Sequence, residues 1–259
     1  AGGVARTSYP RCLAGLRSPA LMNVLVVFGT RPELIKLAPV IRAMRAEPGA
    51  FDVRTCTTAQ HRDLLDPLLE TFQIQPDIDL DLMRPDQTPA DIVAGVVSSL
   101  RPLLDQRPDW MLIQGDTTTT MAAALAARYA RVPIAHVEAG LRTGRLDQPF
   151  PEEINRRVVG TLADLHFAPT TGARDHLRRE GVADESIVVT GNTAIDALHW
   201  ANAQPEPAEV GYLLAGAPAD VILVTAHRRE SFGAPLEEIC QALRDLAEDY
   251  GPAIRIIYP

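Results

Sequence analysis

The sequence has few cysteines, lacks long apolar runs and carries more acidic than basic residues. Its three cysteines, Cys12, Cys56 and Cys240, are far apart and show none of the spacings typical of zinc ligands. We therefore expect reduced thiols in a cytoplasmic protein, without disulfides and without a metal site. No apolar run reaches the length of a membrane-spanning helix, so no membrane-embedded segment is expected.

The net charge of −8 at pH 7 bears on the choice of partner. Proteins that bind nucleic acid or an anionic membrane by electrostatic attraction need a basic face. We expect neither partner for this acidic chain. The 259 residues, 46% of them hydrophobic and 22% charged, suffice for one large domain or for one domain and part of another.

Two nucleotide-binding motifs are missing. The chain has no GxxxxGK[ST] loop, which excludes a P-loop NTPase, and no GxGxxG follows its first apolar run. The second absence argues against a bound dinucleotide such as NAD. We therefore expect no cofactor.

Apolar runs alternate with helical periodicity from Met22 onward, which predicts an α/β fold. Strands alternating with helices at this spacing form a doubly wound, mostly parallel, Rossmann-like sheet. The predicted strands cover residues 22–28, 51–57, 110–114, 133–137, 165–168 and 187–190. The predicted helices start near residues 31, 62, 90, 117, 152, 171 and 193.

The chain divides into four predicted segments. Residues 1–21 have three arginines, no acid and no continuous apolar core, so we expect a non-core leader and no secretory signal. Residues 22–203 form the first domain, and 204–219, rich in Pro, Ala and Gly, form a linker. Residues 220–259 predict one strand–helix–strand unit, which is too short to bury a core. It is either an appendage or, as we favour, the incomplete start of a second Rossmann-like domain.

Two acidic residues follow neighbouring predicted strands. Asp116 comes after Gly115, and Glu138 ends the next strand. Ligands of parallel sheets bind outside the carboxyl ends of the strands, so both acids would face one crevice. Taken alone, Asp116 is expected to be a helix N-cap, whereas Glu138 at a buried strand end needs another explanation. His136 within the strand is expected to be a hydrogen-bonded core histidine.

The first strand leads into a loop with a capping-box helix start, in which Thr30 is the N-cap and Glu33 lies three residues later. The free N–H groups there would form an anion site, and Arg31 could add a bidentate contact to phosphate. The alternative is an ordinary capped helix with a solvent-facing arginine. Lys36, one turn further on, is either functional or a snorkelling surface residue.

Charged residues also occur at a further helix start and in the loop after a further strand. Glu152 and Arg156 lie four apart at a helix start, where an i,i+4 ion pair is the simplest interpretation. His227 and Arg228 follow the first strand after the linker and form either an anion site or a solvated basic turn.

The sequence resembles the bacterial non-hydrolysing UDP-N-acetylglucosamine 2-epimerases over residues 22–259. The matching segments occur in order along the chain: FGTRPELIKLAP (28–39), TAQHRDLLD (58–66), GDTTTT (115–120), HVEAGLRTG (136–144), PFPEEINRR (149–157), TGNTAIDAL (190–198) and TAHRRESFG (225–233). So many motifs in one order make a chance agreement implausible.

The resemblance implies a glycosyltransferase-B architecture, with an active site between two Rossmann-like domains, and interconversion of UDP-N-acetylglucosamine and UDP-N-acetylmannosamine. It implies a homodimer and a second UDP-N-acetylglucosamine bound as activator, beside Gln60 and His61. By position it implies catalytic roles for Lys36, Asp116, Glu138, Glu152, Arg156 and His227. It implies substrate contacts for Arg31, His227 and Arg228. Members of the family continue well beyond residue 259.

The chemistry of such a reaction agrees with this set of residues. The C2 hydrogen of the sugar is not next to a carbonyl, so a base would remove it while UDP leaves C1. Re-addition with protonation on the opposite face then inverts C2, which needs several acid/base groups and cations for the diphosphate. Two alternatives stay open: another transferase or hydrolysing epimerase of this architecture, and a non-catalytic, truncated nucleotide-sugar-binding remnant.

Overall fold

The computed structural model describes residues 21–59, 62–216, 220–226 and 233–258. The chain divides into two compact units: the first ends at Ala201 and the second begins at Asn202. Nearly all of the expected leader lies outside the described residues, as does Cys12. Within the described ranges, no helix has both the length and the apolar character that crossing a membrane requires.

Seven strands form the sheet of the first unit in the order β3-β2-β1-β4-β5-β6-β7, and every neighbouring pair is parallel. The predicted doubly wound parallel sheet is thereby confirmed. Strand β3 was not predicted, because two residues in a Pro- and Asp-rich stretch carry no periodic signal. The strands are β1 (Met22–Phe28), β2 (Phe51–Thr57), β3 (Ile78–Asp79), β4 (Trp110–Gln114), β5 (Ile134–Val137), β6 (Leu165–Ala168) and β7 (Ile187–Val189).

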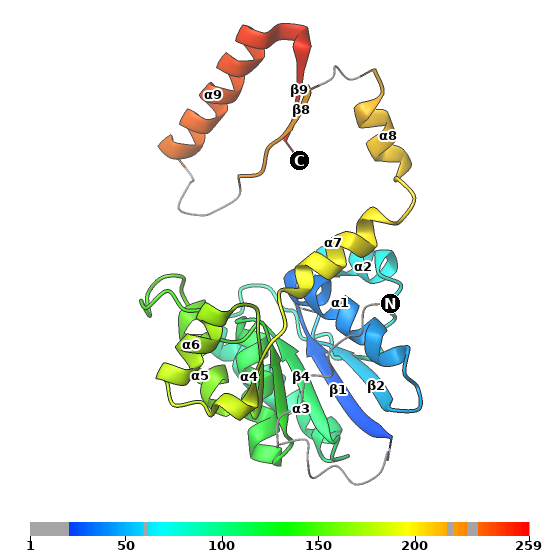
Figure 1. Ribbon diagram of the computed structural model, residues 1–259, viewed down its shortest axis with the longest axis vertical. Coiled ribbons are helices and arrows are strands. Elements are labelled where there is room, and N and C mark those ends of the chain that lie inside the picture. The colour runs from blue at the N-terminus through cyan, green and yellow to red at the C-terminus, as the bar shows by residue number, and fades with distance from the viewer. Residues whose placement is uncertain (1–20, 60–61, 217–219, 227–232, 259) are drawn as a thin grey trace, which may run out of the picture. The chain divides into compact units, whose positions relative to one another are not determined.

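Helices cover both faces of this sheet, because strands buried on both sides carry apolar side chains in both directions. In β1, Val24, Val26 and Phe28 enter one core cluster, whereas Leu25 and Val27 enter the other. The first cluster includes side chains of α1 (Arg31–Arg45), α2 (Arg62–Thr71) and α7 (Thr193–Asn202) (Figure 1). The second includes side chains of α3 (Pro89–Leu104), α4 (Thr118–Ala130) and α5 (Glu152–Leu162).

A smaller core cluster lies at the β6–β7 side of the sheet. Ala173 and Leu177 of α6 (Thr171–Arg179) pack there against Ala168 and Ile187 of the strands. A short 3-10 helix, Asp184–Ser186, leads into β7. These contacts place the α6 backbone directly behind the loop that follows β5, where Ala139 belongs to the same cluster.

The direction of the strand order changes at β1, which has β2 on one side and β4 on the other. In open parallel sheets, a crevice for ligands forms at such a point, outside the carboxyl ends of the strands. The loops after β1, β4 and β5 begin at Gly29, Gly115 and Glu138. The loops predicted to carry the chemistry therefore lie at one edge of the sheet, around this point.

The second unit contains a two-stranded parallel sheet, β8 (Asp220–Leu223) and β9 (Ile254–Ile257), joined through α9 (Ala234–Tyr250) and the 3-10 helix Gly251–Ala253. Helix α8 (Ala208–Leu214) lies within residues 204–219, where a linker was expected. Arg255 of β9 donates to the carbonyl of Leu213 at 2.7 Å, which ties α8 to this sheet. No described residue of α9 is buried.

Candidate functional site

Glu138 directly follows β5 and has a left-handed backbone, with φ of 65°. This conformation is uncommon for a residue other than glycine, asparagine or aspartate and is maintained only where surrounding contacts enforce it. Lys36 Nζ lies 2.6 Å from Glu138 Oε1, and Asn192 Nδ2 lies 3.1 Å from Oε2. Each oxygen of the carboxylate therefore accepts a hydrogen bond from a different element of the fold.

Lys36 is the only lysine among the 25 basic residues of the chain. It lies in the second turn of α1, and its side chain is directed to Glu138, whereas a snorkelling residue would extend into solvent. The ion pair is partly buried, with 24% of the lysine and 9% of the glutamate side chain exposed. Partial burial makes this pair less screened than a surface ion pair.

Asp116 is not the N-cap of α4, contrary to the simplest expectation. The N-cap is Thr117, whose hydroxyl accepts the backbone N–H of Thr120 at 3.1 Å. The Asp116 carboxylate is therefore not used by the helix. Arg156 instead holds it, with Nε at 2.8 Å and Nη2 at 2.7 Å from Oδ2.

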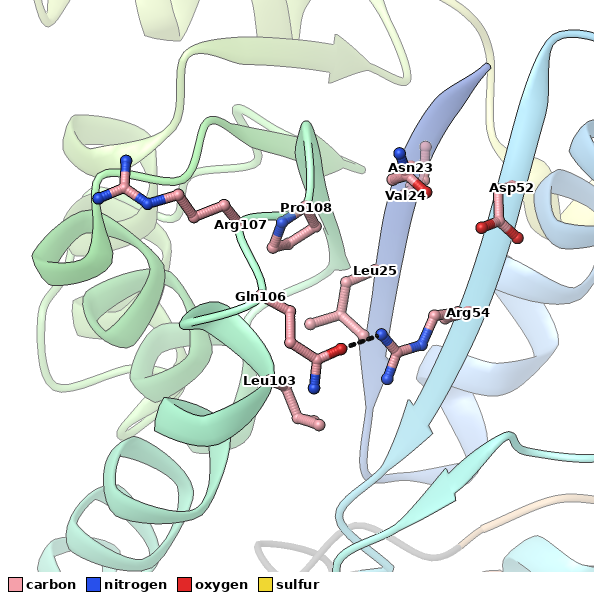
Figure 2. Close-up of a pocket in the computed structure, with 9 residues that line it drawn as sticks. All are labelled: Asn23, Val24, Leu25, Asp52, Arg54, Leu103, Gln106, Arg107 and Pro108. Atoms are coloured by element: carbon pink, nitrogen blue, oxygen red, sulfur yellow. Dashed lines mark hydrogen bonds between the residues drawn. The ribbon is translucent and has the colours of Figure 1, made fainter.

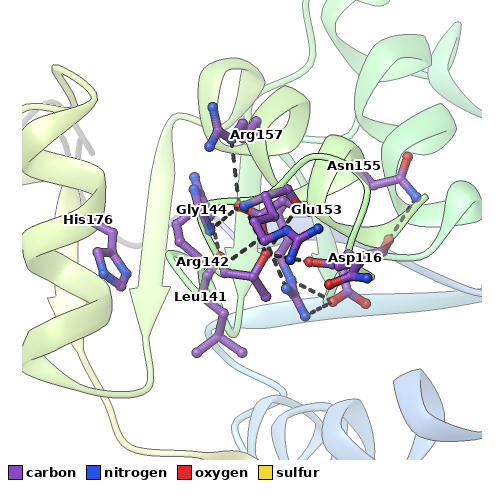
Figure 3. Close-up of polar contacts among 12 residues, drawn as sticks. Asp116, Leu141, Arg142, Gly144, Glu153, Asn155, Arg157 and His176 are labelled. Atoms are coloured by element: carbon purple, nitrogen blue, oxygen red, sulfur yellow. Dashed lines mark hydrogen bonds and ion pairs between the residues drawn. The ribbon is translucent and has the colours of Figure 1, made fainter. Parts of the chain in front are cut away.

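Helix α5 fixes the Asp116 loop through its first two turns (Figure 3). Asn155 Nδ2 donates to the Asp116 carbonyl at 2.8 Å. Glu153, whose side chain is fully buried, accepts from Arg156 Nη1 at 3.2 Å and from the backbone N–H groups of Thr143 and Gly144. Burial alone would raise the pKa of Glu153, but these hydrogen bonds and the Arg156 charge together lower it.

The expected i,i+4 ion pair between Glu152 and Arg156 does not form. Arg156 pairs with Glu153 at i,i+3 and with Asp116, so its guanidinium is already occupied on two sides. Glu152 Oε2 is buried and finds no hydrogen-bond partner among the described residues. This oxygen is therefore available to a ligand or water at the start of α5.

Two backbone N–H groups of the loop after β1 are already bonded within the protein. Glu33 Oε2 accepts the N–H groups of Gly29 and Thr30, both at 2.7 Å, while Oε1 accepts the hydroxyls of Thr117 and Thr120. The capping-box start of α1 is confirmed, and the side chain of its own glutamate occupies the N–H groups of Gly29 and Thr30. The side chain of Arg31, the first residue of α1, is exposed at this loop.

His136 is a hydrogen-bonded core histidine, as expected. Its ring Nε2 donates to the Gly115 carbonyl at 2.8 Å, and burial lowers its pKa to about 3. Gly115 also donates its N–H to the Val137 carbonyl at 3.0 Å. Because Asp116 follows Gly115 and Glu138 follows Val137, these bonds place the two acids on neighbouring strand ends.

The predicted site residues therefore fall into three groups. Lys36 with Glu138, and Asp116 with Arg156, are brought into direct contact. Arg31 and Glu152 lie at the starts of α1 and α5, at the same edge of the sheet. The third group lies outside the described residues and comprises Gln60, His61, His227 and Arg228.

Several residues that organise the site were not predicted: Glu33, Glu153, Asn155 and Asn192. Glu33 was interpreted only as part of a capping box, because local sequence explains it without reference to the site. The signal that could have found Asn192 is its place in a Gly-Asn-Thr loop at the carboxyl end of a strand. An asparagine there reaches the same edge as Glu138.

A cavity of about 250 Å³ lies at the other end of the sheet, where Asn23 and Asp52 lie near the starts of β1 and β2 (Figure 2). Arg54 Nη1 donates to Gln106 Oε1 across it at 2.6 Å. It is therefore separate from the strand ends that carry Asp116 and Glu138. Among the described residues, no group of three or more His, Cys, Asp and Glu side chains is arranged to hold a metal ion.

The family model described as UDP-N-acetylglucosamine 2-epimerase matches residues 42–259. The chain belongs to the UDP-N-acetylglucosamine 2-epimerase family. A member of this family from Yersinia pestis is 50% identical over 246 residues, which are 92% of this chain and 65% of the relative. The chain thus spans slightly less than two thirds of the length of the curated relatives that it matches.

Solved structures of the family share the fold. The enzyme from Neisseria meningitidis bound to UDP-GlcNAc has 41% identity and a TM-score of 0.81, and the match covers 92% of this chain and 66% of that one. The S. aureus MnaA-UDP co-structure has 44% identity and a TM-score of 0.82, covering 92% and 62%. The Rossmann-like domain of a glycosyltransferase-B architecture, expected from the resemblance, is thereby confirmed.

Proposed function

We propose that the protein inverts C2 of UDP-N-acetylglucosamine to give UDP-N-acetylmannosamine. The observation that carries this proposal is the pair of carboxylates on neighbouring strand ends, each bound to its own cation: Glu138 to Lys36 and Asp116 to Arg156. Family membership supports the same substrate, and the Neisseria relative is described with UDP-GlcNAc bound.

The proposed reaction is an elimination followed by re-addition. A base removes the C2 proton, the C1–O bond breaks, and its electron pair leaves with UDP, which gives a 1,2-unsaturated sugar. A proton is then added to the opposite face of C2 while the UDP oxygen bonds to C1 again. The two steps need acid/base groups at both faces of the sugar and cations around the diphosphate.

Asp116 and Glu138 are assigned the two proton transfers, because they are the carboxylates at adjacent strand ends. Lys36 and Arg156 orient these two carboxylates and balance their charge. Glu152 has a buried oxygen without a partner among the described residues. Arg31, His227 and Arg228 are assigned to the diphosphate.

We also propose that the protein works in the cytoplasm as a homodimer, and that a second UDP-N-acetylglucosamine activates it beside Gln60 and His61. These points rest on the resemblance of the sequence. Turnover that rises with substrate in a sigmoidal way supports the activator site, and the mass in solution tests the dimer.

The decisive experiment uses the protein expressed from its complete reading frame, incubated with UDP-N-acetylglucosamine in D₂O. The proposal expects UDP-N-acetylmannosamine with deuterium at C2. Free N-acetylmannosamine would indicate a hydrolysing epimerase, and product formed only with an added acceptor would indicate a transferase. Binding of the nucleotide sugar without reaction would indicate a non-catalytic protein.

The roles of the two acids are tested by Asp116→Asn and Glu138→Gln. Each is expected to lower kcat by about 10²–10⁴-fold, the usual contribution of a general acid or base. Glu47→Gln, an exposed position on the loop after α1, is the matched control and is expected to keep wild-type turnover. Near-wild-type turnover with C2 deuterium exchange in both site variants would overturn the assignment.

A further inference from the structure

We infer that Asn192 is a positioning residue that sets the orientation of the Glu138 carboxylate. This inference rests on the proposed function, since it concerns a group to which that function assigns a proton transfer. Asn192 Nδ2 lies 3.1 Å from Glu138 Oε2, on the oxygen that Lys36 does not bind.

The direction of the Asn192 amide follows from its second hydrogen bond. Its Oδ1 accepts the backbone N–H of Ala194 at 2.9 Å. An N–H group only donates, so the atom facing Ala194 must be the amide oxygen. The NH₂ group is therefore directed at Glu138, whose oxygen can only accept while it is ionised.

Asn192 directly precedes α7, which is anchored on the first unit. At its start, Asn192 bonds to Glu138, and in its middle Ala197 is buried in the core. Near its end, the Trp200 ring stacks on Phe72 with centroids 5.0 Å apart, and Arg42 lies over the same ring at 4.8 Å. An asparagine next to so well anchored a helix has little freedom to move away from its partner.

The backbone of Glu138 explains why its side chain needs external support. Its left-handed conformation, with φ of 65°, aims the side chain away from the direction that an extended strand residue would take. Lys36 binds one carboxylate oxygen and Asn192 the other, so rotation of the carboxylate about its last bond breaks both contacts. The lysine alone would allow the group to pivot about a single oxygen.

Asn192→Asp separates positioning from a merely structural role. Aspartate keeps an oxygen for the Ala194 N–H but replaces the donor to Glu138 with a second negative charge. Asn192→Ala removes both contacts. A structural role predicts that Asn192→Asp behaves like wild type and Asn192→Ala does not, whereas positioning predicts that both fail and that the aspartate is worse.

The expected effect on turnover is large, because misplacing a reacting group by about 1 Å can cost about 10²-fold. We expect kcat to fall about 10–100-fold in Asn192→Ala and about 100-fold or more in Asn192→Asp, with KM within about 3-fold. Asn202→Asp adds the same charge to an exposed position at the far end of the same helix, about 15 Å away at 1.5 Å per residue. This control is expected to match wild type.

A second measurement does not depend on activity. In ¹³C-lysine-labelled protein, the signals of Lys36 are assigned as those that disappear in Lys36→Arg, and the Lys36 ε-CH₂ signal reports protonation of the bound Glu138. Losing a donor to a carboxylate, or gaining a like charge beside it, favours the protonated form. The acid transition of this signal is therefore expected at higher pH in both Asn192 variants than in wild type and in Asn202→Asp.

The outcomes distinguish the two proposals. If wild type does not epimerise UDP-N-acetylglucosamine but the acid transition moves as expected, the proposed function fails and the Asn192 contact stands. If wild type is active and Asn192→Asp keeps both its kcat and its acid transition, the positioning role is overturned. A fall of kcat in Asn192→Ala alone would likewise overturn it. That result is expected if the only role of Asn192 is to accept the Ala194 N–H at the start of α7.

Discussion

Lys36 Nζ lies 2.6 Å from Glu138 Oε1, although the two residues are 102 positions apart in the sequence. Lys36 belongs to the helix after β1 and Glu138 to the loop after β5, with β4 between these strands in the sheet. The contact therefore joins two sides of the edge at which Asp116 follows β4. The long, flexible side chain and compact charge of lysine suit a contact between two such separate elements.

Removing this charge is expected to impair turnover. In Lys36→Met, the Glu138 carboxylate loses its cation, and we expect kcat for epimerisation to fall about 100-fold, a scale typical of one lost acid/base partner. Lys36→Arg keeps the charge, but a planar guanidinium does not replace an ammonium, so a smaller loss of about 10-fold is expected.

The matched control for this position is Arg45→Met, which removes a cation at the other end of the same helix, where Arg45 pairs with Asp77. It is expected to leave kcat unchanged. Turnover of Lys36→Met within about 2-fold of wild type would contradict a role for the ion pair, because such a change is worth less than about 0.5 kcal/mol.

Arg156 is expected to be intolerant even of lysine. Its guanidinium contacts Asp116 with two nitrogens and Glu153 with the third. A lysine supplies one point charge and cannot reproduce this fork, so Arg156→Lys should lower kcat by about 10–100-fold through misplacement of Asp116. The neighbouring Arg157→Lys, whose nearest contact to Glu153 is 3.6 Å, serves as control and should stay within about 2-fold.

The strands and helices of the first unit were largely predictable from sequence because their signals are local. The apolar run at residues 22–28 needs burial on both faces, and a Thr-x-x-Glu pattern starts α1. Predicted and observed bounds are identical for β1, β2, β4 and β6, and α5 begins at the predicted residue 152. Strand β3 and helix α8 carry no such signal, since one is two residues long and the other lies in a Pro- and Ala-rich stretch.

The placement of the candidate residues at one edge of the sheet was predictable, but their contacts were not. Asp116 and Glu138 could be assigned to one edge from the alternation of strands and helices. The partner of Arg156 could not, because i,i+4 spacing favours Glu152, whereas the loop after β4 brings Asp116 to the guanidinium. Glu33 shows the same limit. Its capping role is local, but its Oε1 also accepts hydrogen bonds from the hydroxyls of Thr117 and Thr120 at the start of α4.

Two buried histidines predict a loss of stability on mild acidification. His136 and His166 are neighbours on β5 and β6, and burial lowers their pKa values from 6.5 to about 3 and about 4. Below pH 6.5, these histidines bind protons in the unfolded chain but not in the folded protein. The free energy of unfolding therefore decreases as the pH is lowered. The contribution is complete above pH 6.5 and is lost as pH falls toward the folded values.

The expected size is about 2 kcal/mol for each histidine between pH 7 and pH 5, from the linkage relation. Urea unfolding at the two pH values measures it. His136→Gln, whose amide can donate to the Gly115 carbonyl, should lose about half of this pH dependence, and the exposed His199→Gln should lose none. An unchanged pH dependence in His136→Gln would show that the imidazole titrates normally in the folded state.

Gly140 and Gly144 form a matched pair for the loop that carries Glu138. Both have left-handed backbones, with φ of 88° and 81°, so alanine at either position meets the same conformational cost of about 1–2 kcal/mol. The two positions differ in the room available for a Cβ atom. A Cβ at Gly140 would overlap the Ala173 carbonyl and lie 3.0 Å from Leu177 Cγ, whereas nothing lies within 4 Å of one at Gly144.

We therefore expect Gly144→Ala to lose about 1–2 kcal/mol and Gly140→Ala more than about 3 kcal/mol in urea unfolding, because the second must also displace the α6 backbone. Adding Leu177→Ala to Gly140→Ala removes the side-chain contact but leaves the Ala173 carbonyl in place. It should not restore stability, since a backbone atom within a helix cannot move as a side chain does. Equal stability of the two single variants would mean that α6 can shift away from this loop at little cost.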